Sequence, residues 1–301
     1  ERYNPMNDYV LSCCSTTDLS AGYLKSRNIP YLGYTYFMDG KKLHDDFGQS
    51  LQHSSFYSMM KTGSDTKTTQ LNATEYEAYF TPFLQAGKDV LHVTLSSGLS
   101  GSYNSAMLAK EALEKQFPDR KLIIVDSLGA SSGSGLLVSK LADLRDEGWR
   151  LDDVASWAEK HKQNVQHWFF SSDLTFYIKG GRISKAQGFI GTTMNICPLL
   201  DVNSEGKLIP RAKIRGTKRA IKALVKRMVE LAGDGQQYSD TCFISHSDCL
   251  AEAEAVADLV METFPNLKEK PSIFSIGPTI GSHTGPGTVA LFFFGKPRLN
   301  E

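Results

Sequence analysis

The chain has 301 residues, 41% of them hydrophobic, so it can bury a substantial core and is expected to form two domains. Lysine plus arginine and aspartate plus glutamate each number 33, which argues against the basic excess of a nucleic-acid-binding protein. No apolar run approaches the roughly 20 residues that cross a bilayer, and the first residues lack a signal-peptide core. We expect a soluble cytoplasmic protein without stable membrane insertion.

Five cysteines are present, an odd number without a C-x-x-C pair. This pattern favours reduced, buried thiols over a disulfide framework or a zinc site. Cys13 and Cys14 are adjacent, which is poor geometry for chelating one metal ion. We therefore expect no metal and no cofactor.

The first half of the chain alternates short β-rich runs with amphipathic helices, which predicts an α/β domain with a mainly parallel sheet. Strands are predicted over residues 9–11, 31–37, 90–95 and 122–125. Apolar residues at helical spacing predict helices over residues 74–85, 103–116 and 136–147. Thr74 is expected to cap the first of these helices, and Pro82 to kink it or end it early.

After about residue 165 the pattern changes. Strands are predicted over residues 168–170, 199–202, 208–212, 241–245, 272–276 and 289–294, and helices over residues 218–231 and 250–263. The turn at residues 203–206 predicts a hairpin, so this half should contain a mixed or antiparallel sheet. The predicted fold is therefore α/β with two domains, residues 1–165 and residues 166–301.

Three polar segments lie far apart in the sequence, at residues 67–70, 96–102 and 281–287. These segments set small hydroxyl residues and one histidine, His283, among glycines. In such surroundings, backbone and side-chain hydrogen-bond donors can converge on an anion. The second segment follows a strand and opens a helix, an arrangement that favours anion binding. The alternatives are that Ser100 and Ser102 only cap the helix, and that His283 is a structural residue.

Catalysis is a further alternative, with Ser100 as nucleophile and His283 as base. However, the sequence around Ser100 departs from the G-x-S-x-G elbow, and no acid is evidently placed to orient His283. The glycine spacing at residues 129–135 does not match a dinucleotide fingerprint, and the chain has no Walker A motif or glycine-rich kinase loop. The sequence therefore favours a binding protein over an enzyme.

The chain resembles the DegV proteins, which are also described as the fatty-acid-binding subunits of bacterial fatty acid kinase. The resemblance covers nearly the whole chain and rests on residues 15–20, 67–70, 95–102, 125–127, 179–184 and the His283 segment. It implies a long-chain fatty acid in a tunnel between the two domains, with the carboxylate held by Thr68, Ser100 and His283. We expect a secondary polar site at Thr69, Ser97 and Ser15.

The resemblance also implies a partner, an ATP-dependent kinase subunit that phosphorylates the bound carboxyl group. Arg182 and Arg215 would dock this partner, although each could be a solvated charge or a salt-bridge residue. The chain itself would be a non-catalytic monomer. It departs from the family pattern at Cys14, where an aspartate is usual, and at Leu71, where a proline is usual.

Binding of a fatty acid is physically reasonable. Burying about 14 methylenes at about 0.8 kcal/mol each contributes about 11 kcal/mol of hydrophobic free energy before the costs of association and ordering. Another amphipathic carboxylate, such as a bile acid or retinoid, remains an alternative. Candidate lining residues, each of which could equally be ordinary core, are Phe37, Phe56, Met59, Met60, Phe80, Phe83, Phe189, Ile190, Met194 and Ile280.

Overall fold

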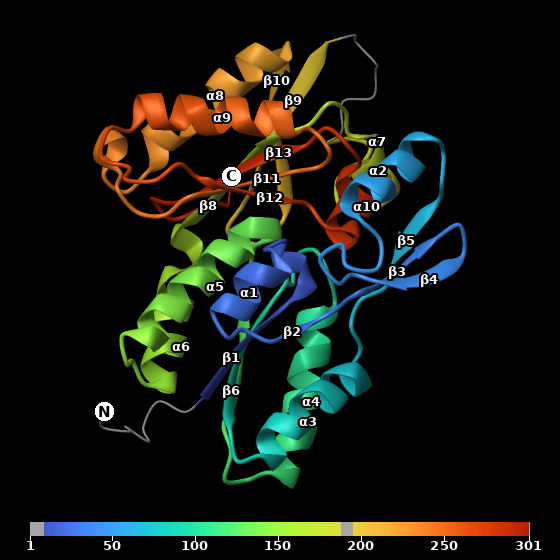
Figure 1. Ribbon diagram of the computed structural model, residues 1–301, viewed down its shortest axis with the longest axis vertical. Helices are drawn as coiled ribbons and strands as arrows, with labels where there is room; N and C mark the ends of the chain where they lie inside the picture. Colours follow the sequence, from blue (N-terminus) through green and yellow to red (C-terminus); the bar gives the residue numbers. More distant parts are fainter. Residues whose placement is uncertain (1–8, 188–194, 301) are drawn as a thin grey trace.

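Two large β-sheets organise the chain, and a third, small sheet projects to one side (Figure 1). The structure is a computed structural model that describes residues 9–187 and 195–300. The larger sheets are a parallel one in the N-terminal half and a mixed one in the C-terminal half, which confirms the predicted fold class. The boundary near residue 165 stays a prediction.

The first sheet has four parallel strands in the order β2-β1-β6-β7. Its strands are β1 (Tyr9–Cys14), β2 (Tyr31–Leu32), β6 (Asp89–Thr94) and β7 (Leu122–Asp126). The helices of this half are α1 (Ala21–Ser26), α3 (Ala73–Gln85), α4 (Ser102–Gln116), α5 (Ser131–Asp146) and α6 (Leu151–His161). The strands and the helices α3, α4 and α5 were predicted, whereas α1 and α6 were not.

Helix α3 ends at the predicted residue but corrects the predicted cap. It is capped by Asn72 instead of Thr74: the Asn72 side chain accepts a hydrogen bond from the Glu75 amide, and the Glu75 carboxylate accepts one from the Asn72 amide. This reciprocal capping box satisfies two free amides at once, which Thr74 could not do from inside the first turn. Pro82 does not end the helix early, because α3 continues to Gln85.

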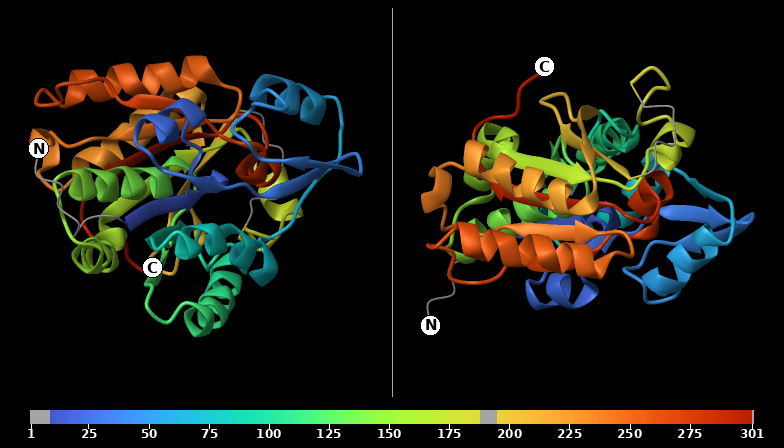
Figure 2. Two further views of the ribbon diagram at one scale, coloured as in Figure 1. Left: turned by 60° about the horizontal axis from the view of Figure 1, so that its bottom comes forward. Right: turned by 90° about the horizontal axis from the view of Figure 1, so that it is seen from above.

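The second sheet has six strands in the order β10-β9-β8-β13-β11-β12. They are β8 (Val165–Phe170), β9 (Ile196–Val202), β10 (Leu208–Arg215), β11 (Phe243–His246), β12 (Ser272–Ser275) and β13 (Val289–Phe294). Only β11 and β12 pair in parallel, and β9 and β10 form the predicted hairpin. Helices α8 (Thr217–Leu231) and α9 (Leu250–Thr263) lie together over one face of this sheet (Figure 2).

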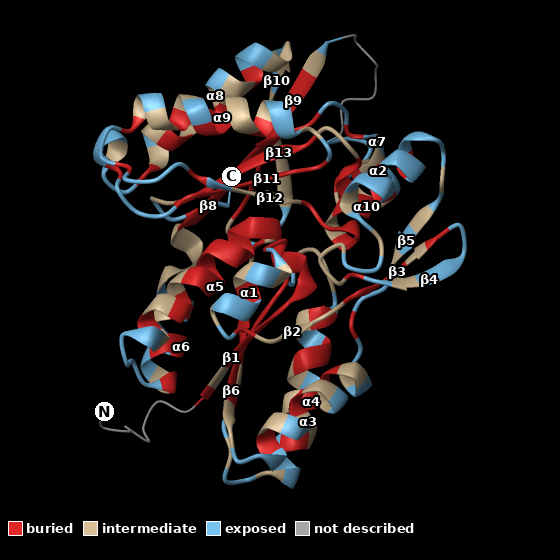
Figure 3. Cartoon of the chain, in the orientation of Figure 1, coloured by how far each residue is buried: buried red, intermediate tan, exposed pale blue. Residues whose placement is uncertain are grey.

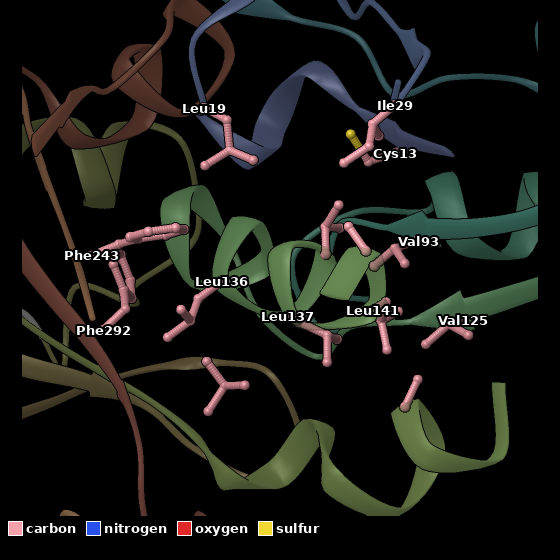
Figure 4. Packing of buried hydrophobic residues seen from close by; sticks show 14 of the residues in the cluster. Cys13, Leu19, Ile29, Val93, Val125, Leu136, Leu137, Leu141, Phe243 and Phe292 are labelled. Atoms are coloured by element: carbon pink, nitrogen blue, oxygen red, sulfur yellow. The ribbon is translucent and has the colours of Figure 1, made fainter. Parts of the chain in front are cut away.

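Helix α5 is the layer that joins the two sheets. It contacts β1 and β6 of the first sheet and β8, β11 and β13 of the second, and it is buried along most of its length (Figure 3). Its leucines Leu136, Leu137 and Leu141 pack between Val93 and Phe292, which belong to different sheets (Figure 4). The first turn lets the layers approach closely, because a β-carbon on Gly133 would lie 2.1 Å from His167 Nε2.

The small sheet was not predicted. It consists of β3 (Thr35–Met38), β4 (Lys41–His44) and β5 (Thr66–Thr68), and α2 (His53–Lys61) lies between β4 and β5 in the chain. The predicted strand over residues 31–37 is divided between two sheets. The division falls at Gly33, where a β-carbon would lie 2.9 Å from the Asp45 carbonyl oxygen.

Two short helices, α7 (Thr175–Lys179) and α10 (Pro278–Thr284), complete the structure together with 3-10 turns at Ser15–Thr17, Lys162–Asn164 and Gly235–Gln237. Helix α10 contains His283, so part of the third polar segment is helical instead of a loop. Pro278 occupies the first turn, where its missing amide costs no hydrogen bond. Helix α10 packs against β3, β5 and α7, which places it between the halves of the chain.

Candidate functional site

A cavity of about 370 Å³ lies where the two large sheets, the small sheet and α10 meet. Its walls come from the end of β5, the turn between β6 and α4, the first residues of α5, and α7 and α10. Its floor is the inner face of the mixed sheet. This volume falls in the range of small-molecule sites. Thr68, Ser100 and His283 all line this one cavity, as do Thr69 and Arg182.

Thr68 and His283 form the centre of the polar end. The distance from Thr68 Oγ1 to His283 Nε2 is 2.7 Å, and His283 Nδ1 lies 3.4 Å from a terminal nitrogen of Arg182. A guanidinium can only donate, so Nδ1 accepts from Arg182 and Nε2 carries the imidazole hydrogen. His283 therefore donates to Thr68 Oγ1, and the Thr68 hydroxyl hydrogen is free to donate to a ligand.

His283 is neutral at physiological pH. Burial, reinforced by the positive charge of Arg182, lowers the pKa of His283 to about 4. Gly180 makes this arrangement possible, because a β-carbon there would lie 2.2 Å from His283 Nδ1. The imidazole thus acts as a hydrogen-bond relay between Arg182 and Thr68 instead of carrying the positive charge of the site.

Arg182 supplies that positive charge. Its guanidinium donates to the Leu99 carbonyl oxygen at 3.1 and 3.3 Å and to the Gly180 carbonyl oxygen at 2.6 Å, and burial lowers its pKa. No carboxylate among the described residues pairs with it. Arg182 is partly buried and forms no salt bridge with a described residue, so an anion in the cavity could be its counter-ion. Arg215, at the end of β10, is exposed and does not line the cavity.

Ser100 presents a hydroxyl from the turn before α4. Its Oγ accepts from the Ser102 amide at 3.2 Å and lies 3.0 Å from Ser102 Oγ, which accepts from the Leu71 amide. Ser102 can therefore donate to Ser100, leaving the Ser100 hydroxyl hydrogen for the cavity. Ser100 makes no hydrogen bond to His283 within the described residues, so the structure offers no nucleophile–base pair.

Tyr34 is a site residue that the sequence analysis missed. It lines the cavity and is 2% exposed, and its hydroxyl has no hydrogen-bond partner within the described part of the chain. Burial raises the pKa of Tyr34, and the hydroxyls of Ser100 and Ser102 oppose that shift without lying in hydrogen-bonding geometry. A buried, unpartnered donor beside Ser100 marks where a ligand oxygen would sit. No sequence signal distinguishes Tyr34 from the neighbouring Tyr31 and Tyr36.

The secondary polar site is only partly assembled. Thr69 lines the cavity, and its hydroxyl donates to the Thr35 carbonyl oxygen at 3.3 Å. Ser97 and Ser15 do not line it: the Ser97 amide donates to Asp126, and Ser15 Oγ accepts from the Tyr34 amide. These two residues support the turns around the cavity instead.

The apolar lining also differs from the expectation, because among the candidate residues that the structure describes only Ile280 lines the cavity. Phe56, Met60 and Phe80 are buried in core clusters, while Phe37, Met59 and Phe83 lie elsewhere, and Phe189, Ile190 and Met194 fall outside the described residues. The observed apolar lining includes Leu95, Leu99, Phe169, Val202, Leu208, Ile276, Ala290 and Phe292. Most of these come from the floor strands, whose inward residues read as ordinary core.

Thiols and metal-ligating side chains are two further kinds of functional group in the described residues. The five cysteines are free thiols, and four of them are buried. Across residues 9–187 and 195–300, no cluster of three or more His, Cys, Asp or Glu side chains could hold a metal ion. In the same part of the chain, no helix has the length and apolar character that a membrane span requires.

Comparison with known proteins identifies the family. The family model described as "Uncharacterised protein, DegV family" matches residues 14–296. A DegV domain-containing protein of Clostridium perfringens is 35% identical over 97% of this chain and 99% of its own length.

Solved structures share the fold. A Thermotoga maritima protein whose structure reveals a fatty acid binding function has a TM-score of 0.81 and 25% identity, covering 96% of this chain and 99% of its own. The fatty acid kinase B3 protein of Streptococcus pneumoniae, loaded with linoleic acid, has a TM-score of 0.82 and 22% identity, covering 96% and 99%. Together with the family match, these findings establish that the chain belongs to the DegV family.

Proposed function

We propose that this protein binds a long-chain fatty acid in the cavity and presents the carboxylate to a separate ATP-dependent fatty acid kinase subunit. The observation that carries the proposal is a single cavity with two unlike ends. One end gathers hydroxyl donors around the Arg182 guanidinium, which has no carboxylate partner among the described residues, and most of the remaining lining surface is apolar. The Thermotoga maritima relative, which binds fatty acid, supports the same reading.

The carboxylate would lie at Thr68, Ser100 and His283, where Arg182 balances its charge. Hydrogen bonds to a charged group are worth about 1.5–3 kcal/mol each, and here they mainly offset the cost of removing the carboxylate from water. Because Thr68 and Ser100 have hydroxyl hydrogens to donate and Arg182 carries a positive charge, the site favours the ionised acid over the protonated one.

The alkyl tail would run along the floor strands away from α10. In the β8–β13 pair, Phe169 lies opposite Ala290 and His167 lies opposite Phe292. Thr288 marks the polar end of the same floor, where its Oγ1 lies 2.8 Å from the Tyr177 hydroxyl. Phe292 lies four positions after Thr288, which corresponds to about 13 Å of floor. The tail would supply most of the affinity through apolar burial.

A carrier function is better supported than hydrolysis of an acyl ester. A serine hydrolase needs its base within hydrogen-bonding reach of the nucleophile. Here His283 Nε2 faces Thr68, and Ser100 faces Ser102. The chemistry of phosphorylation would therefore belong to the partner, which would attach the γ-phosphoryl group of ATP to the bound carboxylate.

Fatty acid binding is tested by delipidating the purified protein and titrating it with palmitic acid. We expect saturable binding of one palmitate per chain, weakened about tenfold or more by Thr68→Val, which keeps the side-chain shape but removes the donor. Ser97→Ala is the matched control, because Ser97 lies outside the cavity, and it should bind like the wild type. Folded, delipidated protein that fails to bind palmitate would overturn the proposal, as would labelling of Ser100 by a fluorophosphonate probe.

Presentation is tested separately, by adding a fatty acid kinase subunit and ATP to the palmitate-loaded protein and measuring acyl phosphate. We expect Arg215→Ala to slow acyl phosphate formation while leaving palmitate affinity unchanged, because Arg215 is exposed and remote from the cavity lining. Equal rates for this variant and the wild type would remove Arg215 from the docking surface. A loaded protein that the kinase subunit never uses would overturn presentation while leaving binding intact. The monomeric state and the cytoplasmic location stay predictions.

A further inference from the structure

Two buried carboxyl groups meet at the start of α10. Asp18 and Asp45, each 1% exposed, come from the N-terminal half, whereas α10 comes from the C-terminal half. Asp18 Oδ1 accepts from the Gly277 amide at 2.8 Å. Asp45 Oδ2 accepts from the Thr279 hydroxyl at 2.6 Å and from the Thr279 amide at 3.3 Å. The two aspartates therefore hold the first turn of this helix.

One oxygen of the pair is left over. Asp45 Oδ1 is buried and has no hydrogen-bond partner within the described residues. A β-carbon on Gly277 would lie 2.9 Å from Asp18 Oδ1 and 3.2 Å from Asp45 Oδ1, so both oxygens flank the same residue. Two ionised carboxylates in this position would repel each other, and an orphaned buried acceptor is rare in native proteins.

We propose that Asp18 and Asp45 share a single proton across Gly277, and that the resulting carboxyl–carboxylate pair positions α10 at the ligand cavity. The shared proton provides the missing partner of Asp45 Oδ1. The one remaining negative charge lies against the Gly277 and Thr279 amides, which donate to the pair. The consequence for the ligand rests on the proposed fatty acid binding, whereas the sharing of the proton does not.

Among the described residues, no positively charged group contributes to the pKa shifts of the pair. Burial raises the pKa of Asp45 to about 6, against the hydrogen bonds from Thr279. Burial, reinforced by the charge of Asp45, raises the pKa of Asp18 well above its usual range. The other titratable groups that bear on the pair are Asp46, Tyr31, Tyr34, Tyr36 and Tyr57. None of these can neutralise a second carboxylate.

The pair connects directly to the cavity. Thr279, which Asp45 holds, lines the cavity, and so does His283 one helical turn further along α10. Ser131 also lines the cavity, and it donates to Asp18 Oδ2 at 2.6 Å. Asp18 and Ser131 both adopt left-handed backbone conformations, with φ values of 47° and 53°. Strained residues persist where the surrounding contacts fix them, so this hydrogen bond is part of a constrained joint.

Asparagine substitutions test the sharing of the proton. In Asp45→Asn, the new amide can donate to Asp18 and still accept from Thr279, so one donor and one charge remain. We expect this variant to bind palmitate within about threefold of the wild type and to keep the NMR tautomer signature of His283. Asp45→Ala removes both roles, and we expect at least tenfold weaker palmitate binding and an altered His283 spectrum. If Asp45→Asn were as damaging as Asp45→Ala, the shared proton would be refuted.

Stability against pH supplies a readout that needs no ligand. Because the folded pKa values of both carboxyl groups are raised, protonation of the pair stabilises the folded state at low pH; the Asp45 contribution is lost as the pH rises through about 6, and the contribution of the proton that remains on the pair is lost at higher pH. We expect Asp45→Asn and Asp18→Asn each to remove this downward slope from the wild-type curve of unfolding free energy between pH 5 and pH 8. An unchanged slope in both variants would refute the proposal. Wild-type protein that fails to bind palmitate but shows the slope would overturn the proposed function only.

Discussion

Replacing Tyr34 by phenylalanine should change ligand affinity and the stability of the unliganded protein in opposite senses. Tyr34 lines the cavity, and its hydroxyl is buried and has no hydrogen-bond partner in the described structure. A buried polar group without a partner costs about 1–3 kcal/mol. Tyr34→Phe removes that cost, so we expect the delipidated protein to become more stable by up to about that amount.

With a fatty acid bound, the same hydroxyl would donate to the carboxylate beside Ser100. Losing a hydrogen bond to a charged group costs about 1.5–3 kcal/mol, which corresponds to about a 10- to 150-fold rise in the dissociation constant. Palmitate titration of delipidated protein measures the affinity. Urea denaturation of the same preparation measures the free energy of unfolding.

Tyr177→Phe is the matched control for stability. Tyr177 also lines the cavity, but its hydroxyl lies 2.8 Å from Thr288 Oγ1, so its removal should lower stability by about 0.5–1.5 kcal/mol. If Tyr34→Phe lowered the stability of the unliganded protein, its hydroxyl would be bonded inside the protein and the reasoning would fail. If stability rose while palmitate affinity stayed unchanged, the hydroxyl would not face the carboxylate.

Three further predictions concern the relay, its protonation and the floor. Gly180→Ala should weaken palmitate binding at least tenfold, because the new β-carbon would lie 2.2 Å from His283 Nδ1. Gly181→Ala is the control: its β-carbon would meet nothing within 4 Å, so this variant should retain palmitate affinity in the same titration despite its backbone strain. The pKa of His283 is lowered to about 4, below its value of about 6.5 in the unfolded chain. The neutral ring therefore stabilises the folded state above about pH 6.5, and this stabilisation is lost as the pH falls toward 4. His283→Gln should remove this acid-side loss from urea denaturation curves, and an unchanged loss would show that His283 is not its source. Ala290→Phe should fill the middle of the floor, so the variant should lose affinity for palmitate while retaining affinity for decanoate. The larger side chain should lower the free energy of unfolding by about 1–3 kcal/mol. Equal losses of affinity for both acids would place the tail elsewhere.

The large sheets and their helices could be predicted from the sequence because their patterns are long and local. The apolar spacing of α9 over Leu250–Thr263 and the β13 run over Val289–Phe294 gave correct limits at both ends. The small sheet could not be predicted in this way. Its strands are three or four residues long, and β4 is largely exposed, so periodicity gives almost no signal. Its position depends on contacts with α10, which lies more than 200 residues away in the chain.

The polar lining of the cavity was indicated by the sequence, and the apolar lining was not. The resemblance to the DegV proteins implied Thr68, Ser100 and His283, and these three residues line one cavity, whereas their binding of a carboxylate stays a prediction. The floor residues Phe169 and Ala290 do not stand out, because an inward residue under a ligand and an inward residue under a helix have the same pattern. The contact of Arg182 with His283 depends on the close approach at Gly180, which no spacing rule reveals.

The two halves of the chain are joined by contacts of different physical kinds. At α5 the joint is apolar, and separating the layers there would expose Leu136, Leu137 and the side chains packed on them. At α10 the joint is largely polar, formed by Asp18, Asp45 and the Tyr57 hydroxyl, which donates to the Ile276 carbonyl oxygen at 2.7 Å. Net hydrogen-bond free energies are about 1 kcal/mol each, whereas burial of one leucine is worth about 1.5–3 kcal/mol.

Local opening at α10 therefore requires less free energy than local opening at α5, because water can replace the hydrogen bonds but not the apolar contacts. The cavity lies beside the polar joint at α10, and a bound ligand would contact α10 together with residues from the N-terminal half. A ligand at 100 times its dissociation constant adds about 2.7 kcal/mol to the stability of the folded state. Because the ligand would bridge the polar joint directly, we expect its stabilisation to appear first as hydrogen-exchange protection of α10 amides, ahead of those in α5.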